Sequence, residues 1–206
     1  MSKNKISNGV KKVDYRKIRN KVINFVKQVC YSKKNKYSDT VWPYHLMPVV
    51  KYSLKLGKKL KADLEVLELA AYLHDLSALV NIKTAGKHHL VSAQIAEKLL
   101  KKWQLPEEKI TRVKECILSH RGSINIKPKN LEAKILASAD AMSHFSQLAD
   151  MMYLTYGIHK FKTRPGAIWL KNKLLRSWRK IMPAGKKLIK KDYQQAMKIL
   201  DQAVTK

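Results

Sequence analysis

The chain has 206 residues, a net charge of +28 and 45% hydrophobic residues, which favours one folded domain, or one and a half, with a substantial core. No apolar run approaches the ~20 residues of a transmembrane helix, and the basic N-terminus lacks the apolar segment of a secretory signal, so we expect neither a membrane partner nor export. Cys30 and Cys116 match no metal-binding spacing and are too few for a disulfide framework, so we expect a reduced, cytoplasmic protein.

Apolar residues recur at helical spacing along the whole chain, and sustained alternation of the kind that predicts strands is missing. The sequence therefore predicts an all-α fold, a helical bundle. A basic arm over residues 1–12 comes first, and the segment 76–87 is expected to be a loop. The expected helices span about 14–29, 38 to 56 or 60, 63–75, 88–103, 106–120, 129 or 130 to 157, 165–182 and 183–203.

The third of these helices carries the most informative pattern. Asp63 is a favourable N-cap, and apolar residues then cover most of the helix surface, which predicts a buried helix. This apolar segment ends with two polar residues side by side, His74 and Asp75. An imidazole and a carboxylate are costly to bury unless each finds a partner, and a divalent cation would satisfy both. A solvated His-Asp pair at a helix end is the alternative.

Further polar residues interrupt the apolar helices in the same way. Asp140 lies in the middle of a long helix and has apolar or small neighbours on almost every side, so it needs a cation or an ion-pair partner. His144 follows it by one helical turn and either supports Asp140 or simply packs. The other candidates all lie at or near helix ends: His45, His88, His89 and His120.

This ordered set of residues resembles the HD superfamily of metal-dependent phosphohydrolases, over about residues 40–155. The resemblance implies an HD-domain helical bundle in which His45, His74, Asp75 and Asp140 hold one divalent metal ion. It also implies a second ion, bridged to the first by Asp75 and held by two further histidines. His88 and His120 stand where those histidines occur, with His89 as the alternative to His88. Such a pair of ions would bind a phosphoryl group and activate a water for in-line attack.

The metal-ligand types are compatible with Mn, Fe, Co, Mg or Zn, one or two ions per chain, and the sequence does not choose among them. The chain departs from the family after the His-Asp pair, where the residues Leu76-Ser77-Ala78-Leu79 lack the expected lysine or glutamate. Positive charge for catalysis would then come from Lys83, Lys87 or Arg121, each of which is otherwise a solvated basic residue. Arg121 is favoured because it adjoins His120.

The excess positive charge is concentrated at the two ends of the chain. Residues 1–37 hold 12 Lys/Arg and one acid, residues 159–206 hold 14 and two, and residues 38–158 hold 17 and 12. We therefore expect a basic N-terminal arm and helix, a central phosphohydrolase domain, and basic C-terminal helices packed on the bundle. Lysine-rich ends predict at most weak, non-specific nucleic-acid binding.

Two functions follow from these observations. The first is an enzyme, a phosphohydrolase that cleaves a phosphate ester or anhydride of a small phosphorylated substrate, with a nucleotide expected. The second is a non-catalytic HD-type protein that docks nucleic acid or another polyanion through its basic ends. The intact set of ligand types favours the enzyme, and the oligomeric state is left open by the sequence.

Overall fold

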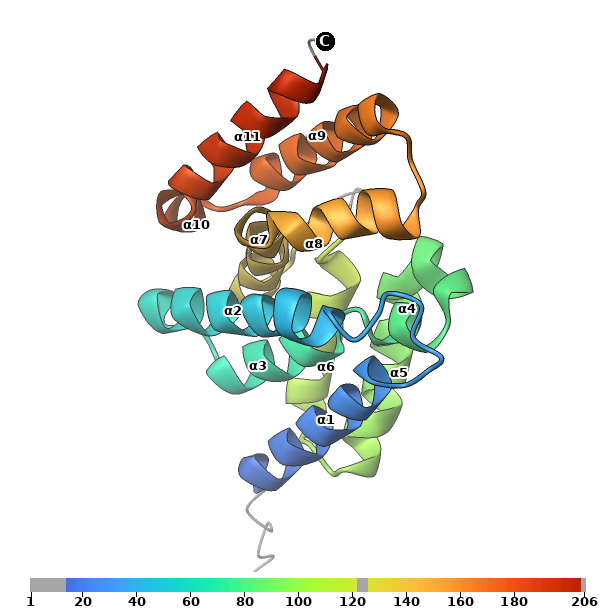
Figure 1. Ribbon diagram of the computed structural model, residues 1–206. Coiled ribbons are helices and arrows are strands. Elements are labelled where there is room, and N and C mark those ends of the chain that lie inside the picture. The colour runs from blue at the N-terminus through green and yellow to red at the C-terminus, as the bar shows by residue number, and fades with distance from the viewer. Residues whose placement is uncertain (1–13, 122–125, 205–206) are drawn as a thin grey trace, which may run out of the picture.

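A computed structural model describes residues 14–121 and 126–204, and every regular element in these ranges is helical (Figure 1), which confirms the all-α prediction for them. None of the helices in these ranges combines the length and apolar character that a bilayer span requires. The α-helices are α1 (Tyr15–Cys30), α2 (Met47–Leu60), α3 (Leu64–Leu73), α4 (Leu76–Val80), α5 (His88–Lys102), α6 (Glu107–Ser119), α7 (Leu131–Ser146), α8 (Leu148–Met152), α9 (Thr163–Lys180), α10 (Pro183–Leu188) and α11 (Lys190–Val204). Three shorter elements are two π-helical turns, η1 (Trp42–Leu46) and η3 (Tyr153–Ile158), and one 3₁₀ segment, η2 (Ile82–Lys87).

Local capping signals account for several helix starts. The side chain of Asp14 accepts a hydrogen bond from the backbone N–H of Lys17, and Asp63 accepts from two backbone N–H groups at the start of α3. Asn130 caps α7 in the same way through the N–H of Ala133. These contacts satisfy N–H groups that have no partner inside a helix. The predicted starts of the three helices are confirmed.

The segment predicted to be a loop between residues 76 and 87 is helical instead. Leu76 and Leu79 bury one side of α4 against the core, which stabilises this short helix although its sequence is not periodic over a long span. Asn81 then ends α4, and its side chain accepts from the N–H of Lys83 to start η2. Burial of these apolar side chains therefore favours a helix over the predicted loop in this segment.

Two predicted long helices are each divided in the structure. The helix expected to reach residue 157 breaks at Gln147, which leaves helical backbone dihedrals (φ −122°, ψ 51°), and α8 and η3 follow. The last predicted helix breaks at Ile189, whose φ is −118°. Neither position is a proline or a glycine. Pro48 was expected to disturb the second helix, and a π-helical turn, η1, indeed precedes α2.

Two apolar clusters hold the bundle together. The first joins α1, α3, α5 and α6, and the second joins α7 to α9, α10 and α11. Every residue of α3 from 66 to 73 is buried, so its C-terminal end, which carries His74 and Asp75, lies inside the molecule. Figure 1 shows α9 and α11 side by side at the end of the molecule opposite α1, next to α7. The two clusters therefore position the end of α3 and the middle of α7 between them.

Candidate metal centre

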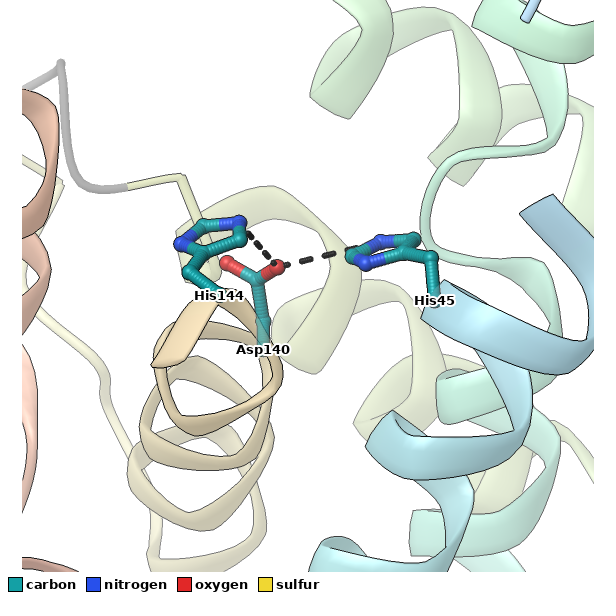
Figure 2. Close-up of side chains that lie close together, drawn as sticks. All are labelled: His45, Asp140 and His144. Carbon is teal, nitrogen blue, oxygen red and sulfur yellow. Dashed lines mark ion pairs between the residues drawn. The ribbon is translucent and has the colours of Figure 1, made fainter. Parts of the chain in front are cut away.

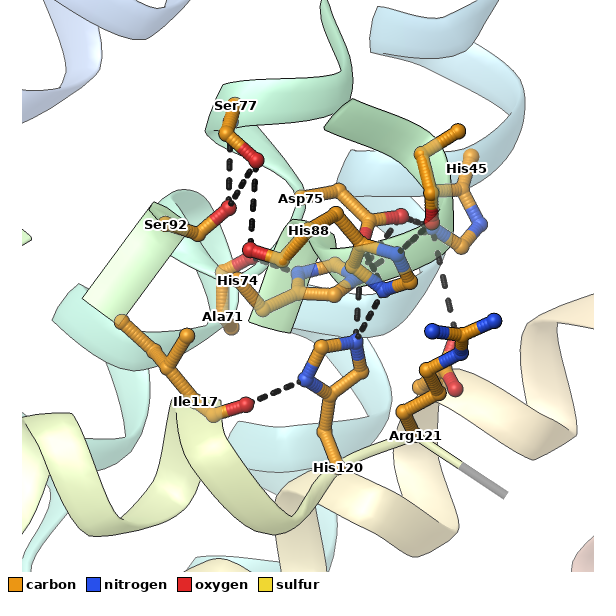
Figure 3. Close-up of polar contacts among 12 residues, drawn as sticks. His45, Ala71, His74, Asp75, Ser77, His88, Ser92, Ile117, His120 and Arg121 are labelled. Carbon is orange, nitrogen blue, oxygen red and sulfur yellow. Dashed lines mark hydrogen bonds and ion pairs between the residues drawn. The ribbon is translucent and has the colours of Figure 1, made fainter. Parts of the chain in front are cut away.

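Six side chains from five segments meet near the C-terminal end of α3 (Figure 3). They come from η1, the turn after α3, the first residue of α5, the residue after α6 and the middle of α7. Most of the surface of each of these side chains is covered. The six are His45, His74, Asp75, His88, His120 and Asp140.

The first group of donor atoms is a triangle of two imidazole nitrogens and one carboxylate oxygen. His45 Nε2 lies 3.3 Å from His74 Nε2, and Asp75 Oδ2 lies 3.3 and 3.4 Å from these two atoms. A triangle of this size has a centre about 2 Å from each corner, close to the length of zinc bonds to nitrogen and oxygen. The three atoms are therefore spaced as ligands of one ion would be.

The second group is built on the other oxygen of the same carboxylate. Asp75 Oδ1 lies 3.2 Å from His88 Nε2 and 3.4 Å from His120 Nε2, and the two nitrogens are 3.1 Å apart. This triangle also has a centre about 2 Å from its corners. Asp75 Oδ1 is buried and has no hydrogen-bond partner among the described residues. A cation at the centre of this triangle would satisfy it.

The protonation of the imidazoles is set by their second nitrogen. Nδ1 of His74, His88 and His120 lies 2.8, 2.7 and 2.6 Å from the backbone carbonyls of Ala71, Ala85 and Ile117, respectively. A carbonyl oxygen only accepts, so each Nδ1 carries a hydrogen and each ring directs Nε2 into the centre, where the neutral form of the ring presents a lone pair. Anchoring of this kind is typical of metal-binding histidines.

His45 is oriented through a hydroxyl group. Ser143 Oγ donates to the carbonyl of Asp140 (2.7 Å) and lies 3.2 Å from His45 Nδ1, so it accepts the Nδ1 hydrogen. Nε2 of His45 is then also free to act as a ligand. All four imidazoles of the two triangles therefore direct Nε2 toward the centre, where each neutral ring can act as the ligand of a cation.

Charge within the centre is strongly coupled. Burial opposes ionisation of Asp75, but the imidazoles of His74 and His88 outweigh it and hold the pKa of this carboxyl well below 3.8. Burial also disfavours a charged His74, but Asp75 and Asp140 outweigh it and raise the pKa of His74 to about 9. Burial lowers the pKa of His120 to about 4, against the attraction of Asp75. Asp75 is therefore ionised at neutral pH.

Asp140, the buried acid that was expected to need a partner, forms an ion pair with a lysine, Lys180. Lys180 Nζ donates to Asp140 Oδ2 and to the carbonyl of His120, both at 2.7 Å. The other oxygen of Asp140 faces His45 and His144, with Oδ1–Nε2 distances of 3.9 and 3.6 Å (Figure 2). These three residues form another group of donor atoms within 4.8 Å of one another. His144 is held by Ser177, 2.9 Å from its Nδ1.

Three of the candidate residues lie outside the centre. The structure places His88 against Asp75, whereas His89 is buried beside the His88 ring and belongs to none of the groups of donor atoms. Lys83 and Lys87 are exposed in η2 and do not line either pocket at the centre. Arg121 does line a pocket there, and its guanidinium donates to the carbonyl of Gly86.

Two adjoining pockets open on the centre. One, of about 200 Å³, is lined mainly by apolar side chains such as Leu79, Met151 and Leu154. The other, of about 350 Å³, is lined by cationic residues and by His120 and Asp140. Both pockets include Asp75 in their lining, so a ligand in either one reaches the shared carboxylate.

The cationic wall of the larger pocket comes from α9, which the sequence analysis assigned to packing on the bundle or to docking of a polyanion, and not to the catalytic site. Lys173, Arg176 and Lys180 all line this pocket. Their spacing of three and four residues places them on one helix face, and this pattern was the signal available in the sequence. The basic C-terminal segment is therefore part of the site and not only an appendage to it.

Comparison with known proteins gives one family match, one relative and one solved structure of similar fold. Residues 44–144 match the family model of the HD domain. An uncharacterized protein of Clostridium beijerinckii is 25% identical over 132 residues, which cover 60% of this chain and 82% of that protein. A crystal structure of a predicted HD superfamily hydrolase from an uncultured Thermotogales bacterium matches with a TM-score of 0.50 and 23% identity, over 77% of this chain and 83% of the other. At this identity, the likeness to the crystal structure is one of fold.

Proposed function

Because residues 44–144 make this chain a member of the HD superfamily, we propose that it is a metal-dependent phosphohydrolase, which cleaves a phosphate ester or anhydride of a small substrate, with a nucleotide expected. The observation that supports this most strongly is the pair of donor triangles that share the carboxylate of Asp75. Carboxylates that join two ion sites are suited to reactions at phosphorus, where both the attacking and the leaving oxygen need stabilisation.

The residues fit divalent ions. His45, His74 and Asp75 would hold one, and Asp75, His88 and His120 would hold the other, with Asp140 beside the first. When bound, such ions supply Lewis acidity and lower the pKa of a coordinated water. Nitrogen and oxygen donors without thiolate are compatible with Mn, Fe, Co, Mg or Zn.

The chain itself contributes fixed geometry and charge. The carbonyl-bound imidazoles need no reorientation when a ligand arrives, which lowers the entropic cost of assembling the site. Arg121 is held by the Gly86 carbonyl at the edge of the cationic pocket, where its positive charge would orient a phosphoryl group. Asp75 stays ionised, so its two oxygens remain ligands and not proton donors.

The cysteines are compatible with the compartment that we propose, the cytoplasm. Cys30 and Cys116 are both buried and free. Burial raises the pKa of each thiol, to about 12 for Cys30, so neither is a reactive thiolate at neutral pH. Unpaired thiols of this kind are ordinary in a reducing compartment.

The test is the substitution Asp75→Ala, which removes the ligand shared by both triangles. We expect the purified variant to lose bound metal, measured by elemental analysis, together with hydrolysis of a nucleotide and phosphodiester panel. Asp39→Asn, at an exposed loop carboxylate, is the matched control and should retain both. Hydrolysis that survives in Asp75→Ala would contradict the proposal. Metal binding by the native chain without hydrolysis of any substrate would favour the non-catalytic alternative.

A further inference from the structure

We propose that the face of α9 formed by Lys173, Arg176 and Lys180 binds a polyphosphate chain, so that the substrate is an organic di- or triphosphate and not a monoester or a cyclic diester. This inference rests on the proposed function and narrows its substrate class. The helix lies outside the segment that matches the HD domain, so the assignment comes from this chain's own C-terminal residues.

The first support is the position of the three cations. They follow one another by three and four residues, so they lie along one face of α9. That face forms a wall of the 350 Å³ pocket, and His120 and Asp140 line the same pocket. A ligand in this pocket therefore lies beside a wall that carries all three cations.

Lys173 gives the second support, because its ammonium group lacks a protein counter-ion. Across residues 14–121 and 126–204, no hydrogen bond or ion pair joins it to another residue. It nevertheless lines both pockets and is largely covered, and this burial lowers its pKa. A covered ammonium without a carboxylate is costly, and an anionic ligand in the pocket would offset that cost.

Lys180 differs from Lys173 because it is already bonded to the centre. Its ammonium group donates to Asp140 and to the carbonyl of His120. It therefore marks the junction between the carboxylate cluster and the α9 face. Arg176 lies one helical turn before it and is exposed toward the pocket, free of any ion pair with the described residues.

The third support is the balance of charge. The cationic side chains that line the two pockets are Arg121, Lys173, Arg176 and Lys180, and the carboxylates are Asp75, Asp140 and Asp150. The pockets thus hold one more cation than carboxylates before any divalent ion adds its own two charges. A phosphate group carries about two negative charges at neutral pH. One phosphoryl group at the metal centre would leave Lys173 and Arg176 unmatched, whereas one or two further phosphates would pair with them.

The smaller, mainly apolar pocket is suited to the organic part of the proposed substrate. The adjoining 200 Å³ pocket, which Asp75 also lines, is bordered by Val41, Leu79, Met151 and Leu154 with the rings of Tyr37 and Tyr153. Apolar and aromatic linings of this kind hold the organic portion of a ligand, while a few polar groups fix its orientation. The two pockets share Lys173 and His88, so one molecule can occupy both.

The experiment measures binding of inorganic probes to the full chain after removal of metal by a chelator. Isothermal titration with orthophosphate, pyrophosphate and tripolyphosphate at fixed ionic strength should show the tripolyphosphate bound at least about tenfold more tightly than orthophosphate. Lys173→Met and Arg176→Gln should each weaken tripolyphosphate binding about tenfold, the effect of losing one charge-assisted hydrogen bond. Lys173→Arg should restore it. Thermal melting confirms that each variant is folded.

The matched control is Arg164→Gln, which removes one charge from an exposed residue of the same helix that lines neither pocket. Its affinity for tripolyphosphate should equal that of the native chain. An equal loss in Arg164→Gln would overturn the inference, because binding would then follow net charge alone. The absence of a preference for tripolyphosphate over orthophosphate would also overturn it, because the α9 face would then hold no further phosphate groups.

A turnover assay separates this inference from the proposed function. The metal-loaded chain is tested on a simple aryl phosphate monoester and on nucleoside mono-, di- and triphosphates. Preference for the monoester, with kcat/KM unaffected by Arg176→Gln, would overturn the inference and leave the phosphohydrolase standing. No hydrolysis of any substrate, with tripolyphosphate binding still dependent on Lys173 and Arg176, would overturn the proposed function and leave the binding site standing.

Discussion

At the scale of single residues, the centre depends on which nitrogen of each imidazole faces inward. His88 and His89 are adjacent in the sequence, yet the helix start at α5 turns only His88 toward Asp75. The carbonyl of Ala85 then holds its Nδ1, so its Nε2 meets the other donors. His89 Nδ1 is buried and has no hydrogen-bond partner among the described residues. Adjacent histidines therefore have different surroundings that can be tested separately.

We predict that His88→Ala lowers the metal content of the saturated chain from about two ions to one, because it removes a ligand of the second triangle only. His120→Ala should do the same, since it removes another corner of that triangle. Elemental analysis of the purified variants measures both. His89→Ala is the control and should keep the native count. A native chain that holds a single ion, lost in neither variant, would contradict a second site.

At the scale of elements, three helices are joined by one network of charges. Glu132 of α7 accepts a hydrogen bond from the backbone N–H of Asp63 and pairs with Arg112 of α6, both at 2.9 Å. Arg112 also reaches the Asp63 side chain at 3.2 Å. The network thus fixes the N-terminal end of α3 to α6 and α7, and so positions the opposite end of α3, which carries the candidate metal ligands His74 and Asp75.

This network predicts a pH dependence of stability. Burial opposes ionisation of Glu132, but the Asp63 N–H and Arg112 outweigh it and lower the pKa of this carboxyl below 4.5. The folded state then binds fewer protons than the unfolded chain, so Glu132 stabilises the fold above about pH 4.5 and loses this effect as the pH falls below it.

Glu132→Gln should therefore reduce the free energy of unfolding by about 1–3 kcal/mol at pH 7, and the difference from the native chain should shrink toward pH 3. Urea denaturation at a series of pH values measures it. Glu107→Gln, an exposed glutamate at the start of α6, should change stability by less than about 0.5 kcal/mol. A difference that is constant with pH would show that Glu132 acts through packing and not through its charge.

The docking of α9 on α7 gives a second prediction at this scale. Leu174 is fully buried in the second apolar cluster, whereas Ile168 of the same helix is 41% exposed. Leu174→Ala should destabilise the chain by about 2–5 kcal/mol, the usual cost of a large cavity. Ile168→Ala should cost far less. Chemical denaturation of both variants is the measurement, and equal effects would mean that α9 is not held through this face.

A helix start or end could be predicted from the sequence where the residues that determine it lie close together in the chain. Asp14 and Asp63 cap helices through contacts within three residues, and these starts were predicted. The break at Gln147 has no proline or glycine to mark it and depends on packing around it. Lys180 shows the same limit for the site, because its contact with Asp140 joins residues 40 positions apart in the sequence. The pattern of candidate ligands was visible in the sequence, and so was the basic face of α9, but the long-range contact that brings this face to the pocket was not.

At the scale of the whole molecule, the positive charge divides into two parts with different roles. Part of the C-terminal charge belongs to basic residues of α9 that line the pocket at the centre. The basic arm over residues 1–12 lies outside the described residues, and its role stays a prediction. Because α9 lines the pocket at the centre, the positive charge of this helix belongs to the candidate site.

We predict that deleting residues 1–12 leaves metal content and nucleotide turnover nearly unchanged. Any affinity for RNA or DNA should be weak, independent of sequence and steeply reduced by salt, because it would come from counterion release by lysines. Filter binding over a range of salt concentrations, on the full chain and the deletion, measures it beside hydrolysis. Tight, salt-resistant binding by a chain that hydrolyses nothing would favour the non-catalytic alternative.

The dependence of the site on α9 has a consequence for synthesis of the protein. A ribosome that adds 5–20 residues per second takes about 2–7 s to proceed from residue 145 to residue 180. During this interval the nascent chain holds all the histidines that we propose as metal ligands, while the apolar face of α7 around Met142 is uncovered and Asp140 lacks Lys180. Exposed apolar surface at this stage favours aggregation. Slow codons between these positions would lengthen that stage and lower the yield of native protein.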